Sequence, residues 1–189
     1  MQKIYLLSLI AIFSMITGCA HNINITPPTI NKSKVEIAPK TVGFFISTAN
    51  KAKQVESPGG GGDRVSYAPY RDLESLLFGT LMRVYANVEP LSSLEQAAGK
   101  PLSLVFIPEI ETDSSSSSAL TWPPTDFKVT INMKTQDPAG KVLWTESVTG
   151  NGKAEFSEFK NDYSLSAKRA AQDAIDKLEV ALRKREGLN

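Results

Sequence analysis

Cysteine and histidine each occur only once in this chain of 189 residues. A single cysteine excludes a disulfide within the chain and a metal site built from several thiolates. The single histidine, His21, lies in a polar stretch near the N-terminus, which is typical of a solvated side chain. A Ser-His-Asp hydrolase needs a histidine beside its nucleophile, and the Gly-x-Ser-x-Gly pattern is also absent. The sequence therefore predicts that the protein is not an enzyme.

The chain also has no large excess of positive or negative charge. Lysine and arginine total 21 and aspartate and glutamate total 20, so the basic stripe that nucleic-acid binding requires is not expected. The glycine run Gly59–Gly62 lacks the Lys-Ser/Thr pair of a phosphate-binding loop, and no Asp-rich calcium loop is present. We expect no nucleic-acid partner, no cofactor and no metal, and we interpret the glycine run as a surface loop.

Apolar runs long enough to cross a membrane are also lacking. The stretch Ile4–Ile16 is interrupted only by Ser8 and Ser14. It falls short of the roughly 20 residues that span a hydrocarbon core about 30 Å thick. Preceded by Lys3, the stretch has the charge and length of the apolar region of a secretory signal peptide. Residues 1–18 are therefore predicted to be a signal peptide.

The residues that follow are Ile16-Thr17-Gly18-Cys19. An apolar residue, a small residue, Gly and Cys directly after such a stretch resemble the lipobox of bacterial lipoproteins. This resemblance implies that the Cys19 thiol receives a diacylglycerol, that the signal is cut before Cys19, and that the new amino terminus is acylated, for example by palmitate. Ala20, in place of Asp, resembles the proteins that Gram-negative cells sort to the outer membrane. Alternatives are an uncleaved membrane anchor and an ordinary secretory signal followed by an unrelated cysteine.

The rest of the chain is long enough for one domain of ordinary size. Residues 19–39 are polar and contain Pro27-Pro28 without sustained periodicity, so we expect a lipidated N-terminus and a flexible tether. Extended, such a tether would let the domain stand tens of ångströms from the bilayer. Residues 40–189 are predicted to form a single periplasmic domain.

Two helices are predicted from apolar residues that recur every three or four positions. In the segment Pro69–Asn87 these residues are Tyr70, Leu73, Leu77, Leu81 and Val84. In the segment Asp162–Arg185 they are Ala167, Ala171, Ala174, Leu178 and Ala181. Because alanine side chains are small, the second helix is expected to lie close against a sheet.

Four strands are predicted, of which Phe127–Met133 has the clearest alternation of apolar and polar residues. The others are Thr41–Ile46, Leu102–Ile107 and Val142–Val148, and Asn151-Gly152 is interpreted as a tight turn leading to a further strand. The serine run Ser114–Ser118 fits either a strand or a loop. The element order predicts an α+β fold. We expect a two-layer sandwich with a mostly antiparallel sheet of about four to five strands and two main helices.

Trp122, Pro123 and Pro124 are the candidate partner-binding residues, because exposed aromatic residues beside prolines are common anchors at protein interfaces. The alternative is that Trp122 folds back onto the core. Glu109 and Glu111 share one face of a strand, which favours a solvated face over acid–base chemistry. The sequence therefore favours a non-enzymatic binding or scaffold subunit of a cell-envelope assembly, with an envelope protein as partner. The alternative function is a carrier of an apolar ligand such as lipid.

Overall fold

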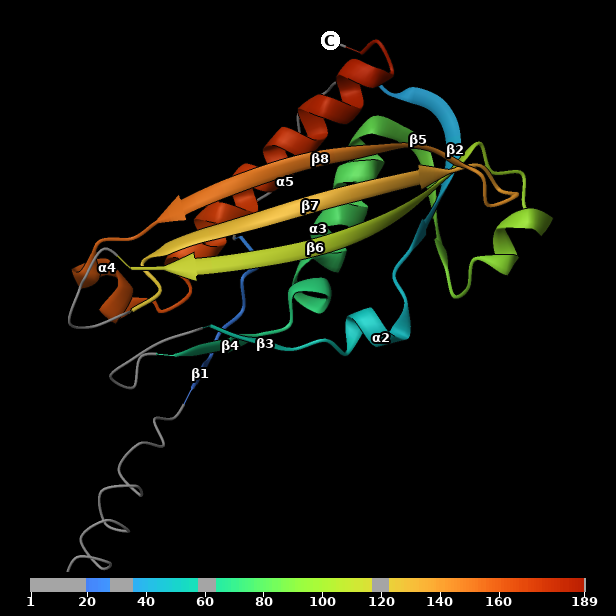
Figure 1. Cartoon of the computed structure of the whole chain (residues 1–189). Coiled ribbons are helices and arrows are strands. Elements are labelled where there is room, and N and C mark those ends of the chain that lie inside the picture. Colours follow the sequence, from blue (N-terminus) through green and yellow to red (C-terminus); the bar gives the residue numbers. More distant parts are fainter. Residues whose placement is uncertain (1–19, 28–35, 58–63, 117–122, 189) are drawn as a thin grey trace, which may run out of the picture.

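A five-stranded sheet with its two long helices on one face forms most of the fold (Figure 1). The computed structural model describes residues 20–27, 36–57, 64–116 and 123–188. The strands of the large sheet are β2 (Ala38–Phe45), β5 (Tyr85–Leu91), β6 (Leu104–Ser115), β7 (Asp126–Gln136) and β8 (Val142–Lys153). A small sheet contains β1 (His21–Asn22), β3 (Val55–Glu56) and β4 (Val65–Tyr67). The helices of the described residues are α2 (Thr48–Lys51), α3 (Pro69–Val84), α4 (Phe156–Asn161), α5 (Leu165–Arg185) and the 3₁₀ helix η1 (Glu95–Gly99).

The large sheet has the strand order β5-β2-β6-β7-β8 and is mixed. Strands β6, β7 and β8 form the expected antiparallel meander, whereas β2 pairs in parallel with both β5 and β6. The α+β class and a mostly antiparallel sheet are therefore confirmed, but the sheet is not strictly antiparallel. The reason lies in the connection from β2 to β5, which contains α3. A crossover through a helix returns the chain to the same end of the sheet, so the two strands run in the same direction.

Helix α3 lies beneath the sheet with the apolar face that its spacing predicts. Tyr70, Leu73, Leu77, Leu81 and Val84 are all buried. The helix ends at Val84, three residues before the predicted end. Tyr85 takes extended backbone angles and begins β5 at once, so no loop separates the two elements.

Helix α5 packs against β8 at backbone contact. A Cβ atom built on Gly150 would lie 2.1 Å from the carbonyl oxygen of Ala170, and one on Gly152 would lie 2.0 Å from that of Ser166. The buried alanines of α5 are the small residues that permit this approach, as expected. The predicted turn at Asn151-Gly152 is wrong, because β8 runs unbroken to Lys153. The two glycines are needed for packing and not for turning the chain.

Residues at the N-terminal end of the described chain are built into the domain. Ile25 is fully buried, and β1 pairs in parallel with β4. The predicted tether is therefore wrong for residues 21–27, because a two-residue strand has no periodicity that a sequence could show. Cys19 and residues 28–35 lie outside the described residues.

Asp72, in the first turn of α3, fastens this segment. The backbone carbonyl of Asp72 accepts a hydrogen bond from the Thr26 hydroxyl at 2.7 Å. Burial raises the pKa of the Asp72 carboxyl, while the N–H groups of Ala68 and Ile25 donate to it and act in the opposite direction. The segment is thus held by hydrogen bonds at the start of α3 in addition to its own apolar contact.

Candidate binding surface

The face of the sheet turned away from α3 and α5 is divided into two parts. Over β2 and part of β6 it is covered by η1, with a second apolar cluster of Leu91, Ala97, Leu102, Val105 and Ile107. Over the meander it is polar and exposed. Glu109 and Glu111 lie there, opposite Asn132 and Thr130 of β7. The two glutamates therefore belong to a solvated strand face, as predicted. Ser114 and Ser115 end β6, so the serine run begins as strand.

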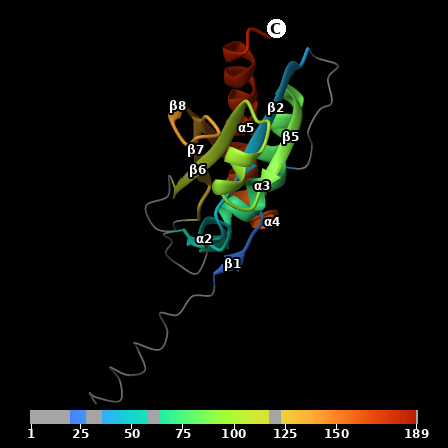
Figure 2. The same ribbon diagram turned by 90° about the vertical axis from the view of Figure 1, so that its right-hand side faces the viewer.

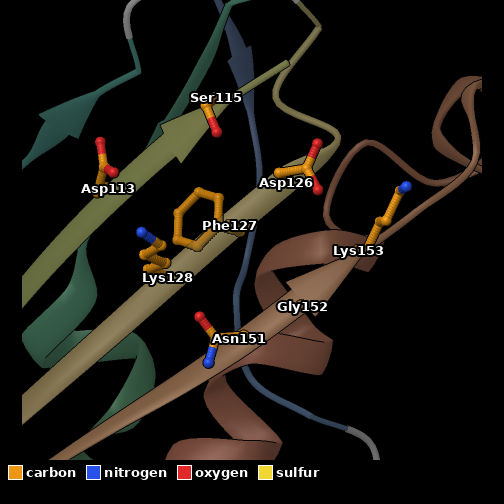
Figure 3. Close-up of a pocket in the computed structure, with 8 residues that line it drawn as sticks. All are labelled: Asp113, Ser115, Asp126, Phe127, Lys128, Asn151, Gly152 and Lys153. Carbon is orange, nitrogen blue, oxygen red and sulfur yellow. The ribbon is translucent and has the colours of Figure 1, made fainter. Parts of the chain in front are cut away.

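A polar pocket of about 200 Å³ lies at one end of the meander, where three strands contribute its walls (Figure 3). Its lining residues are Asp113, Ser115, Asp126, Phe127, Lys128, Asn151, Gly152 and Lys153. The charges face each other in register, with Asp113 opposite Lys128 and Asp126 opposite Lys153. Oppositely charged residues on neighbouring strands stabilise a sheet, and this accounts for the composition of the pocket without a ligand.

A second and larger hollow lies between β8 and the C-terminal half of α5; we call it the β8–α5 groove. Its volume is about 800 Å³, and it is lined by Glu146, Asp176, Lys177, Val180, Ala181, Lys184 and Arg185. Val180 is 66% exposed, and Val142 and Leu143 at the start of β8 are 52% and 46% exposed. Exposed apolar residues rimmed by charged ones are typical of surfaces that bind other proteins.

Strand β8 is an edge strand of the large sheet, so its outer side carries backbone groups without a neighbouring strand. Part of this edge is capped by one row of α5 side chains, spaced four residues apart. Arg169 donates to the carbonyl of Lys153 at 2.6 Å, and Lys177 donates to the carbonyl of Thr149 at 2.9 Å. Between them, Asp173 accepts from the N–H of Asn151 at 2.9 Å. The row closes the C-terminal part of the edge to other strands.

Asp173 is ionised in this row. Partial burial alone would raise its pKa, but the Lys177 ammonium and the Asn151 N–H hold the pKa of the carboxyl below its usual value. The Lys177 ammonium lies 2.7 Å from the carboxylate. The cap is therefore fully formed at neutral pH.

The N-terminal part of the same edge has no such cap among the described residues. Because outward groups alternate along a strand, the backbone groups of Thr145 and Ser147 point outward like those of Thr149 and Asn151. The α5 side chains that cap Thr149 and Asn151 have no counterpart here, and the β8–α5 groove opens beside this part. An extended segment of another chain can pair with β8 at Thr145 and Ser147 while its side chains enter the groove.

Arg185, which lines the groove, is held by contacts with two side chains of β8. The Arg185 guanidinium lies over the Trp144 ring, 4.2 Å from its centroid, and also lies 3.0 Å from the Glu146 carboxylate. Trp144 in turn contacts Phe106 edge to face, with 5.8 Å between ring centroids. These contacts connect Arg185, and with it one side of the groove, to the core.

Two of the residues predicted for partner binding, Pro123 and Pro124, do not line the β8–α5 groove. Pro123 and Pro124 are buried, and the carbonyl of Pro124 accepts a hydrogen bond from the Ser166 hydroxyl at 2.7 Å. The two prolines therefore add no exposed surface. Trp122 lies outside the described residues, and its part in partner binding stays a prediction. The sequence analysis did not predict the β8–α5 groove. An apolar residue, Val180, between Asp176 and Lys184 on the polar side of α5 could have indicated it.

Two features are absent from the part of the chain that the structure describes. No three side chains of His, Cys, Asp or Glu gather there as a metal ion would need. No helix in these ranges has both the length and the apolar character to cross a membrane.

Comparison with known proteins shows the fold. No family model matches the chain, and no curated protein matches its sequence. Among solved structures, protein XCC0632 of Xanthomonas campestris, described as a DUF330 protein, has a TM-score of 0.54 at 9% identity, with 89% of this chain and 95% of that chain covered. At this identity the likeness shows a common fold and not a common function.

Two other structures are less similar. A minor lipoprotein of Acinetobacter baumannii has a TM-score of 0.41 at 14% identity, with 75% of this chain and 94% of that chain covered. A PelC dodecamer of Paraburkholderia phytofirmans also has a TM-score of 0.41, at 18% identity, with the same shares covered. Likenesses of this degree do not identify a role for the chain.

Proposed function

We propose that this protein is a lipid-anchored, periplasm-facing lipoprotein of the outer membrane, and that it acts as a non-enzymatic binding subunit of a cell-envelope assembly. The anchor is the acylated Cys19 of the lipobox-like sequence Ile16-Thr17-Gly18-Cys19. The binding surface is the uncapped part of the β8 edge together with the β8–α5 groove. The observation that carries the binding role is this open strand edge beside exposed Val180.

The partner that fits this surface is an extended segment of an envelope protein. Main-chain hydrogen bonds to Thr145 and Ser147 would supply affinity, and alternate side chains would enter the groove and supply specificity. The groove contains three cations and two carboxylates: Lys177, Lys184, Arg185, Glu146 and Asp176. A segment that alternates apolar residues with residues of modest negative charge matches this lining.

The alternative, a carrier of an apolar ligand, needs space between the sheet and its helices. Along the C-terminal part of β8 there is no such space, because α5 contacts Gly150 and Gly152 at backbone distance. The β8–α5 groove and the polar pocket both lie at the surface. The packing therefore favours a protein-binding subunit over a lipid carrier.

A photo-crosslinking residue at position 180 is expected to capture a specific envelope protein in intact cells. The matched control is position 82 on α3, where Met82 is 55% exposed, and no specific adduct is expected there. Mass spectrometry of the adduct identifies the partner. An adduct with the mass of two copies of this chain, or no adduct at position 180, would contradict the proposed partner.

The substitution Thr145→Pro tests the strand-pairing mode. Proline is tolerated in an edge strand where its nitrogen faces outward, but it cannot donate a hydrogen bond to an added strand. We expect the crosslinking yield at position 180 to fall roughly tenfold, as loss of about 1.4 kcal/mol of binding energy implies. Thr145→Val keeps the N–H and should retain capture. Equal yields for the two variants, with equal thermal midpoints, would exclude pairing at this edge.

A further inference from the structure

The docked N-terminal segment determines how far the domain can lie from its anchor. The N–H of His21 donates to the carbonyl of Arg64 at 2.8 Å, and the N–H of Ile23 donates to that of Ser66 at 2.9 Å. Together with buried Ile25, these bonds make His21 part of the folded domain.

Only two peptide units separate Cys19 from His21. Consecutive Cα atoms are 3.8 Å apart, so two units reach at most about 7.6 Å. The headgroup layer on each side of a bilayer is roughly 5–8 Å thick, the difference between a core of about 30 Å and a whole bilayer of about 40–45 Å. A Cys19 whose acyl chains lie in the hydrocarbon therefore keeps His21 within or directly beside the headgroup layer.

Strand β1, which begins at His21, and helix α4 lie toward the same end of the fold (Figure 1 and Figure 2). The His21 ring stacks on that of Tyr163, with 4.2 Å between centroids and an interplanar angle of 14°. Tyr163 contacts the buried ring of Phe159 in α4, with 5.1 Å between centroids. A continuous series of ring contacts thus fixes α4 relative to the residue nearest the anchor.

Phe156 lies one helical turn before Phe159 and is 50% exposed. The Lys160 ammonium lies 5.6 Å from the centroid of its ring. A half-exposed aromatic ring beside a long cationic side chain suits the membrane interface, where the ring enters the acyl boundary and the ammonium remains among headgroup phosphates. The carboxylate of nearby Glu158 lies 2.9 Å from the Arg169 guanidinium. Its negative charge is therefore compensated and does not repel headgroup phosphates.

We propose that α4 is the membrane-contacting surface of the protein, with Phe156 inserted at the lipid interface and Lys160 at the headgroups. The inference rests on the lipid anchor proposed above. The sequence alone predicts a domain on a flexible tether that can stand away from the bilayer. The proposed contact instead holds the domain against the bilayer in a single orientation. The start of β8 lies at the far end of the sheet from α4 (Figure 1), so the uncapped edge is directed away from the membrane toward a periplasmic partner.

The test uses the acylated full-length protein. Because Cys19 is the only cysteine, acylation leaves an engineered Phe156→Cys as the single free thiol, which is labelled with an environment-sensitive NBD fluorophore. The control is Val142→Cys, whose native side chain is exposed to a similar degree at 52%. Both proteins are reconstituted into vesicles of phosphatidylethanolamine and phosphatidylglycerol, and thermal midpoints are compared to confirm that both fold.

We expect the label at 156, but not at 142, to shift its emission to shorter wavelength on reconstitution. Lipid-attached nitroxide should quench the label at 156 severalfold more than the label at 142, and aqueous iodide should show the opposite order. Equal quenching at the two positions would overturn the membrane contact of α4. Acylation is checked beforehand by the mass of the N-terminal peptide, so failure of the lipid anchor is recorded separately from failure of the orientation.

Discussion

Replacing Cys19 with serine is expected to abolish acylation of the protein completely. The diacylglycerol is joined through the sulfur of a thiol, and Cys19 is the only thiol in the chain. A serine hydroxyl is a far weaker nucleophile at neutral pH than a thiol. If the signal is cut only before a lipid-bearing cysteine, the variant should also keep residues 1–18.

Metabolic labelling with palmitate and the mass of the N-terminal peptide measure this prediction. Membrane fractionation alone is not sufficient, since an uncleaved apolar stretch Ile4–Ile16 can itself hold the precursor at a membrane. Thr17→Ser preserves Gly18-Cys19 and should be labelled and cleaved like the original protein. Unchanged labelling of Cys19→Ser would show that the protein is not a lipoprotein of the proposed kind.

Replacing Gly150 with alanine is expected to lower the free energy of unfolding by about 3 kcal/mol, the upper end of the usual cost of overpacking. The added Cβ would lie 2.1 Å from the carbonyl oxygen of Ala170 and 2.3 Å from the backbone nitrogen of Ala174. Both atoms belong to the backbone of α5, which can move only as a whole. Pushing the helix outward weakens the contacts of its buried alanines with β7 and β8.

Thermal or urea denaturation of the purified protein checks this result, and a fall of roughly 6–12 °C in the midpoint is expected for a domain of this size. Gly99→Ala is the matched control, because a Cβ there meets nothing within 4 Å and should change stability by less than about 1 kcal/mol. If the two variants are equally stable, α5 does not lie at backbone contact with β8.

Several helices and strands could be predicted because the residues within each segment determine its structure. The apolar spacing of α3 and the alternation of β7 are properties of a single segment facing a single environment, and both segments have the expected buried faces. The alanine face of α5 also indicated a close helix–sheet contact, which the structure shows.

Other predictions were wrong where the structure of one segment depends on its contacts with a distant segment. Asn151-Gly152 has the composition of a turn, but Gly152 is required by the backbone of α5 and lies inside β8. Residues 21–27 lack periodicity, yet Ile25 fills a position in the core that other segments define. The direction of β2 relative to β5 and β6 depends on the path of the chain through α3, which no pattern within β2 records.

The sequence by itself determined the lipobox-like signal ending at Cys19, the two main helices and the meander of the sheet, because each depends on residue types within one short segment. Only the tertiary structure decided that residues 21–27 are docked and not free. It also decided that, among the described residues, α5 caps one half of the β8 edge and leaves the other half open. Both depend on which backbone groups and which part of the core a distant segment reaches. These contacts depend on the distances between segments in the folded chain, which cannot be read from the residues of either segment alone.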